Sequence, residues 1–143
     1  MKTHLFATLS TLITLAAVSG CGATRDVKVS GTVATSSTNG ANGPVRIEFY
    51  EPAGSADAAA STAPELRLVD SATLQAAGPF QQTVSMQGNK LYVVAIVDTD
   101  HNGACTAGES WGEAIVTVGT DDTATATVSV TPEAHCLPMS TPE

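Results

Sequence analysis

Basic residues are scarce in this chain, and their scarcity excludes two kinds of partner. The 143 residues include 6 lysines and arginines against 14 aspartates and glutamates, which gives a formal net charge of −8 at pH 7. Nucleic-acid binding depends on clustered Lys and Arg that neutralise phosphates, and an anionic lipid surface attracts polybasic segments. The sequence has no such cluster, so we expect no nucleic-acid partner and no electrostatic contact with a membrane.

The chain also lacks an uninterrupted apolar run of transmembrane length. Its first residues, MKTHLFATLSTLITLAAVSGC, contain one lysine, an apolar core broken by threonine and serine, and small residues ahead of a cysteine. A spanning helix needs about 18 or more apolar residues, whereas a basic start with a short apolar core is typical of a signal peptide. We therefore predict a signal peptide over residues 1–20.

The end of this segment, Val18-Ser19-Gly20-Cys21, resembles the lipobox of bacterial lipoproteins. The resemblance implies that Cys21 is acylated and becomes the new amino terminus, with residues 21–26 as a lipidated tether. Several acyl chains, each worth about 0.8 kcal/mol per buried methylene, would anchor the protein to a membrane lastingly. Because no aspartate follows Cys21, the resemblance implies a bacterial cell-envelope location, at the outer membrane in a Gram-negative cell. An ordinary secretory signal is the alternative.

Cysteine is rare too, with three in the whole chain. If Cys21 carries lipid, Cys105 and Cys136 remain, and an even pair in an oxidising compartment favours a disulfide. On the chain-entropy model, closing this loop would stabilise the fold by about 3.5 kcal/mol. A zinc or copper site built from the same two sulfurs with His101 and His135 is the competing interpretation, but its spacing matches no familiar zinc module.

Helical periodicity is nearly absent, and alternation with period two replaces it. Seven segments show apolar residues on one or both faces, separated by the turn-forming stretches NGANGP, AAGP, QGNK and GTDD. They are residues 27–33, 45–50, 66–74 with a bulge or break near Asp70, 80–86, 91–97, 114–118 and 123–130. Residues 91–97 are apolar on both faces, which predicts a central strand. We predict an all-β fold, a single seven-stranded β-sandwich over residues 27–131, followed by a tail over 132–143.

The stretches VSGTV, PVRIEFYEP and GPFQQTVSMQGNKLYVVAIVD together resemble the transthyretin-like or carboxypeptidase-regulatory-like sandwich, with an Ig-like sandwich as the related alternative. The resemblance extends loosely over residues 27–98. The following VDTDHNGACTAGESWG is similar to the calcium loops of bacterial surface sandwiches of the B-repeat kind. These resemblances imply a scaffolding, stalk or binding function rather than catalysis.

The stretch DTDHNGACTAGE, residues 98–109, has the spacing of an EF-hand-like calcium loop. Calcium takes six to eight oxygen ligands, which a twelve-residue loop supplies from positions 1, 3, 5, 7, 9 and 12. The corresponding candidate ligands are Asp98, Asp100, Asn102, the carbonyl of Ala104, Thr106 and Glu109. Gly103 falls at the sharp turn, where a positive φ is expected. Because a strand precedes the loop, an EF-hand helix pair is excluded. The alternative to a calcium loop is an acidic turn that binds no ion.

One catalytic motif also occurs, in the letters GESWG around Ser110, which fit the G-x-S-x-G nucleophile elbow. The elbow requires a helix after the serine, whereas the next segment is predicted as a strand. We therefore expect no enzyme. Trp111 is interpreted either as a ligand-contacting aromatic residue or as a cap over the end of the sandwich.

The sequence thus favours an exported, lipid-anchored protein whose calcium-stabilised β-sandwich is a structural or interaction module of the cell envelope. The alternative is a calcium-dependent carbohydrate- or peptide-binding lipoprotein that uses Trp111, Tyr50 or Tyr92. An envelope protein or a glycan is the candidate partner.

Overall fold

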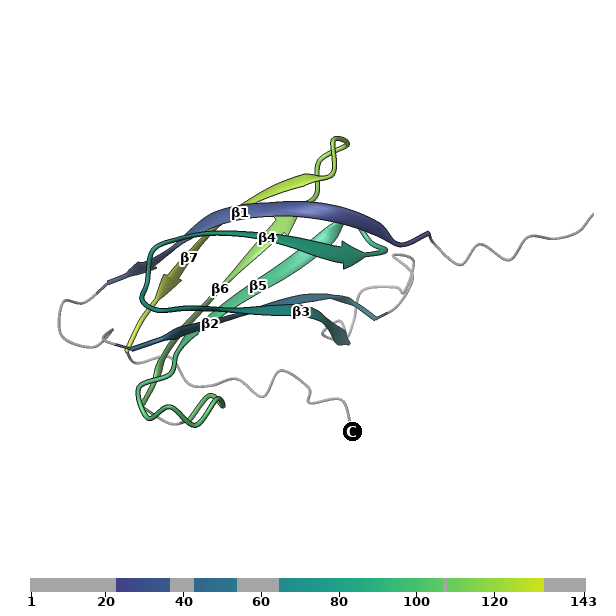
Figure 1. Ribbon diagram of the computed structural model, residues 1–143. Helices are drawn as coiled ribbons and strands as arrows, with labels where there is room; N and C mark the ends of the chain where they lie inside the picture. The colour runs from purple at the N-terminus through teal and green to yellow at the C-terminus, as the bar shows by residue number, and fades with distance from the viewer. Residues whose placement is uncertain (1–22, 37–42, 54–64, 107, 133–143) are drawn as a thin grey trace, which may run out of the picture.

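The computed structural model describes residues 23–36, 43–53, 65–106 and 108–132, and it is all-β over these residues. The seven strands are β1 (Arg25–Thr35), β2 (Val45–Pro52), β3 (Leu66–Leu74), β4 (Pro79–Met86), β5 (Lys90–Val97), β6 (Ser110–Thr117) and β7 (Thr123–Val130). They form two sheets, β4-β1-β7 and β3-β2-β5-β6, that pack face to face (Figure 1). The predicted seven-stranded β-sandwich is confirmed. No helix in these described ranges is long and apolar enough to cross a membrane.

Strict alternation along the strands builds the core between the sheets. In β7, Ala124, Ala126, Val128 and Val130 are buried while the hydroxyl residues between them are exposed. Successive side chains of a strand point to opposite faces, so one face is available for burial and the other for water. Phe49 of β2 and Phe80 of β4 meet with tilted rings, their centroids 6.1 Å apart, and thereby join the two sheets.

β5 is an interior strand between β2 and β6, as the apolar pattern predicts. Its inward side chains, Leu91, Val93, Ala95 and Val97, are fully buried in the core. Val94 and Ile96 do not belong to that core cluster but lie on the opposite face, where they are almost as well buried.

The predicted start of the sixth strand at residue 114 is wrong, because β6 begins at Ser110. Gly112 lies before the predicted start of this strand, but it pairs with Ala95 inside β6. A Cβ atom on Gly112 would lie 2.1 Å from the carbonyl oxygen of Ser129, so glycine allows β6 to approach β7 closely. The bridge between Trp111 and Thr131 lies at the same crossing.

β3 carries the bulge that the sequence predicts near Asp70. The pairing register with β2 shifts between Phe49 and Tyr50, so that Asp70 faces Phe49 but Leu68, two residues away, faces Tyr50. The extra residue turns Leu68 to the outer face of the sheet. β1 and β7 pair in parallel, which the sequence analysis does not specify.

The two ends of the sandwich differ. At one end β1 begins, and Arg25 there contacts the carbonyl of Gly88 in the β4–β5 turn and the carboxylate of Asp122 in the β6–β7 turn. β5 starts near this end at Lys90 and runs to the other end, where it leads directly into the Asp98–Glu109 loop (Figure 1). The eight residues of β5 therefore separate the start of β1 from the loop by about 27 Å.

Candidate metal centre

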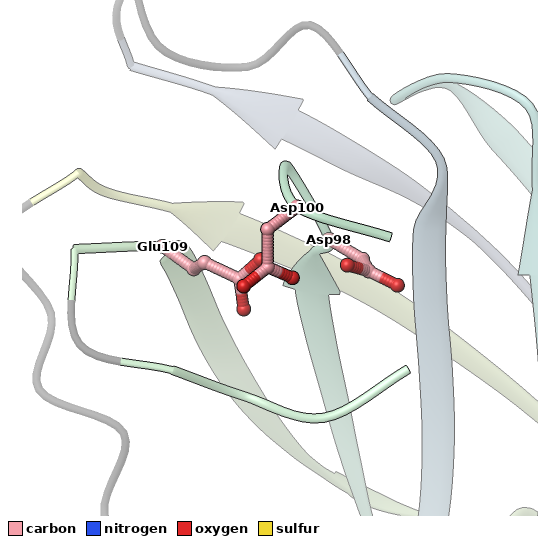
Figure 2. Close-up of side chains that lie close together, drawn as sticks. All are labelled: Asp98, Asp100 and Glu109. Carbon is pink, nitrogen blue, oxygen red and sulfur yellow. The ribbon is translucent and has the colours of Figure 1, made fainter. Parts of the chain in front are cut away.

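Two paired strands bring the ends of the acidic loop together. Val97, the last residue of β5, pairs with Ser110, the first residue of β6. The loop between them therefore begins at Asp98 and ends at Glu109 on neighbouring strands. Figure 2 shows Asp98, Asp100 and Glu109 pointing toward one another, and one carboxylate oxygen from each lies within 4.8 Å of the others.

Asp98 is fixed by backbone N–H groups on the opposite side of the loop. Its Oδ1 accepts a hydrogen bond from the N–H of Asn102 at 3.1 Å, and its Oδ2 accepts one from Gly103 at 2.9 Å. Desolvation alone would raise the pKa of Asp98, but the N–H groups of Gly103 and Asn102 outweigh it and lower the pKa below its ordinary value. These hydrogen bonds therefore favour the charged form of Asp98.

The sharp turn behind these contacts depends on left-handed backbone conformations. Gly103 has φ +73°, which confirms the prediction for the sixth position. His101, two residues earlier, also has a positive φ of 59°, which the sequence analysis did not anticipate. Such values are uncommon for a residue with a Cβ atom, so the loop imposes this conformation on His101.

Asp100 organises the polar side chains of the loop. Its Oδ1 accepts the N–H of Asn102 at 3.1 Å, and its Oδ2 accepts the side-chain amide of Asn102 at 2.8 Å and the hydroxyl of Thr106 at 3.4 Å. The amide oxygen of Asn102 in turn accepts the N–H of Ala104 at 2.6 Å. Asn102 and Thr106 thus contact Asp100 directly, whereas Ala104 contacts Asn102; the role of these three residues as ligands stays a prediction.

Glu109 is the buried member of the cluster, with 2% of its surface exposed. Its Oε1 accepts the N–H of Thr99 at 2.8 Å, and its Oε2 accepts the N–H of Thr106 at 3.0 Å. One carboxylate therefore ties the start of the loop to its second half. The hydroxyl of Thr99 also donates to Oε1, at 3.4 Å. Thr99 is not among the predicted ligands, because it stands at the second position of the loop, which supplies no ligand in the calcium pattern.

A second buried carboxylate, Glu51 at the end of β2, provides a comparison. It is also 2% exposed and accepts N–H groups from Gln87 and Gly88, but it forms an ion pair with Arg67. Burial alone would raise the pKa of Glu51, and the two N–H groups together with Arg67 lower it instead. A buried charge normally has such a partner of opposite sign.

The buried Glu109 has different neighbours from those of Glu51. Among the described residues, the ion pairs join Arg25 to Asp122, Arg46 to Glu48 and Arg67 to Glu51, and none reaches the loop. Glu109 instead faces the two further carboxylates of Asp98 and Asp100. Like charges at this distance repel one another, and a cation among them would replace that repulsion with attraction. The cluster can hold a metal ion.

The remaining predicted residues lie around the loop or outside the described ranges. Cys105 is disulfide-bonded, while its predicted partner Cys136, the lipidation candidate Cys21 and the zinc candidate His135 lie outside the described residues, so the pairing stays a prediction. Ser110 is buried at the start of β6, where a strand and not a helix follows it.

The three aromatic residues named as candidate ligand contacts share one surface. Trp111 pairs with Ile96, and Tyr50 pairs with Tyr92. Tyr50 and Tyr92 alternate with buried residues along their strands, and Trp111 pairs with the outward Ile96, so all three lie on the outer face of the β3-β2-β5-β6 sheet. Trp111 is beside the loop and the tyrosines are farther from it. Trp111 is the second residue of β6, and both interpretations of its side chain, as a ligand contact and as a cap, stay predictions.

Comparisons of the chain with protein-family models, with curated proteins and with solved structures gave no match. The resemblances to lipoproteins and to transthyretin-like sandwiches therefore remain expectations from the sequence.

Proposed function

We propose that the Asp98–Glu109 loop binds a calcium ion that stabilises the sandwich of an exported, lipid-anchored protein. The observation that carries this proposal is the convergence of three carboxylates, those of Asp98, Asp100 and the buried Glu109, with no ion pair among the described residues to balance them. The metal would supply the positive charge that Arg67 supplies to Glu51.

The chemistry of the donors favours calcium over zinc or copper. The clustered ligands are carboxylate oxygens, which suit hard cations, whereas zinc and copper sites are rich in imidazole and thiolate. Calcium also tolerates irregular geometry, so carbonyl, amide or hydroxyl oxygens from Asn102, Ala104 and Thr106, or water, can complete six to eight ligands. A site of this kind in an extracellular module has a dissociation constant on the order of 0.1–1 mM.

In this proposal the ion acts as a structural link. Because Asp98 follows β5 and Glu109 precedes β6, an ion between them joins the ends of two neighbouring strands. The lipobox at Val18–Cys21 supports attachment to a membrane, and only residues 22–24 separate Cys21 from β1. The sandwich would then sit close to the bilayer as a structural or interaction module of the cell envelope.

A calcium titration monitored by calorimetry tests the ion site directly. We expect one ion per chain for the protein from residue 22 onward, which contains both sheets and the whole described core. Glu109→Gln should remove the binding heat, whereas Glu113→Gln, a substitution of an exposed glutamate four residues along β6, should keep it. Equal binding by both variants, or no binding by the unmodified chain, would refute the site.

Calcium-dependent binding of a carbohydrate or peptide is the second candidate function. It is favoured by the position of Trp111, two residues after Glu109 on the outer face of β6. A glycan or peptide array in calcium and in chelator tests it. Binding that requires calcium and disappears in Trp111→Ala would support this function, and an array without hits would reject it.

A further inference from the structure

The two outer faces of the sandwich differ sharply in chemistry. On the β4-β1-β7 sheet, the outward residues are mostly hydroxyl and amide side chains, such as Gln81, Ser30 and Thr125 in one cross-strand row. On the β3-β2-β5-β6 sheet, the outward residues include the exposed Leu68 and Ile115 and the half-buried Tyr50 and Tyr92. Burial by a partner would therefore lower the free energy more on the second face than on the first.

One row across this second face contains only large apolar and aromatic side chains. The pairing register places Leu68 opposite Tyr50, Tyr50 opposite Tyr92, and Tyr92 opposite Ile115. Leu68 is 46% exposed and Ile115 is 58% exposed, and they are the two exposed large hydrophobic residues of the described part of the chain. We refer to Leu68, Tyr50, Tyr92 and Ile115 as the tyrosine row.

The order of residues in the tyrosine row is symmetric. An aliphatic residue stands at each end, and the two tyrosines stand between them on β2 and β5. A two-fold axis parallel to the strands and passing between β2 and β5 would place Leu68 on Ile115 of a second copy, and Tyr50 on Tyr92. Two-fold contacts require a surface that complements itself in this way. We propose that the tyrosine row is the centre of a homodimer interface, an inference independent of the calcium site.

The charges on the face agree with a second copy as the partner. The outward charged residues are Arg46 and Glu48 on β2, Lys90 on β5 and Glu113 on β6, two of each sign. Arg46 and Glu48 pair with each other at 2.6 Å. Because the whole chain has a formal net charge of −8, two copies repel one another over most of their surface. They can meet at this face, whose own charges sum to zero.

One side chain of the tyrosine row is also held in place before a second copy binds. The Tyr50 hydroxyl donates a hydrogen bond to Glu48 at 2.6 Å, which fixes the ring and reduces the entropy lost on association. Four strands at about 4.8 Å spacing and eight residues at about 3.4 Å give a face of roughly 500 Å² per copy. Two such faces can bury at most about 1,000 Å², because Val94 and Ile96 are already buried, and this is the size of a weak, transient dimer.

Sedimentation velocity over a range of protein concentrations tests the proposal. The protein from residue 22 onward should show a reversible monomer–dimer equilibrium, and Ile115→Lys should weaken the dimer at least about tenfold by burying an unpaired charge. The matched control is Thr125→Lys, which adds the same charge to an exposed, outward position of the edge strand β7 on the opposite sheet, and it should leave dimerisation unchanged.

Dityrosine coupling gives a second measurement, since the chain contains only the two tyrosines of the row. Mild oxidation can couple Tyr50 to Tyr92 within one chain, so the readout is the species of twice the mass, which should form in the unmodified chain and in Thr125→Lys but little in Ile115→Lys. A monomer at every concentration up to the millimolar range would overturn the proposal. A dimer that survives Ile115→Lys, or association only when a glycan or another protein is added, would also overturn it.

Discussion

Calcium removal should lower the melting temperature of this protein by an amount that follows from the dissociation constant typical of such a site. An ion that binds the folded chain and not the unfolded one stabilises it by RT ln(1 + [L]/Kd). With a dissociation constant of about 0.1–1 mM and about 10 mM calcium, the free energy of unfolding rises by about 1.4 to 2.7 kcal/mol. For a domain of this size that corresponds to about 5 to 10 °C.

The assay is thermal unfolding followed by circular dichroism, in calcium and in chelator at matched ionic strength. Matching matters because an acidic chain gains stability from any screening cation. Glu109→Gln should abolish the calcium response. Without calcium two effects of this variant oppose each other, because the amide can accept from only one of the Thr99 and Thr106 N–H groups but no longer repels Asp98 and Asp100.

Two comparisons make the experiment decisive. Glu113→Gln removes one exposed negative charge from β6 and should retain the full calcium response. Magnesium should have a weaker effect than calcium, since it demands strict octahedral geometry and keeps its water ligands. A melting curve that chelator leaves unchanged, or an undiminished calcium response in Glu109→Gln, would refute the reasoning that the three carboxylates need a metal ion.

Three further predictions concern the scaffold. Glu51 has a pKa lowered from its ordinary value of 4.5, so its stabilisation is present above about pH 4.5 and is lost as the pH falls toward the folded-state pKa. Glu51→Gln should therefore flatten the acid limb of a plot of unfolding free energy against pH, and an unchanged limb would contradict its role. Gly112→Ala should lower the free energy of unfolding in urea by about 1–3 kcal/mol, because the added Cβ atom would clash with the Ser129 carbonyl. The control Gly78→Ala, where nothing lies within 4 Å of the added Cβ atom, should leave this free energy nearly unchanged. Reduction should add two hydrogen atoms to the intact mass if Cys105 pairs with Cys136 within one chain, and Cys136→Ser should abolish this change; a species of twice the mass would indicate pairing between chains.

Local alternation predicts most strands because it depends on neighbouring residues alone. The regular spacing in TATATVSV and the apolar residues on both faces of 91–97 correspond to β7 and to an interior β5. The same reasoning fails at Gly112, because the need for glycine comes from Ser129 on another strand. It also cannot find the ion pair of Glu51, whose partner Arg67 is brought close by the pairing of β2 and β3.

The acidic loop and the tyrosine row can be predicted from the sequence to different degrees. The spacing of Asp98, Asp100 and Glu109 is visible in the sequence, and the structure brings these three together. The tyrosine row is not visible, because it depends on pairing registers across four strands. Leu68 joins the row only through the bulge in β3; with uninterrupted pairing it would face Glu51 and point inward.

The start of β1 at the end of the sandwich opposite the acidic loop has a consequence for how two copies would stand on a bilayer. A two-fold axis parallel to the strands leaves their direction along that axis unchanged, so both Arg25 ends emerge on the same side of the pair. Two acyl anchors at Cys21 would then enter one leaflet together, with both loops about 27 Å farther out, away from the headgroups. Confinement to a plane raises the effective concentration of such copies, so a pairing that is weak in solution would become well populated on the membrane.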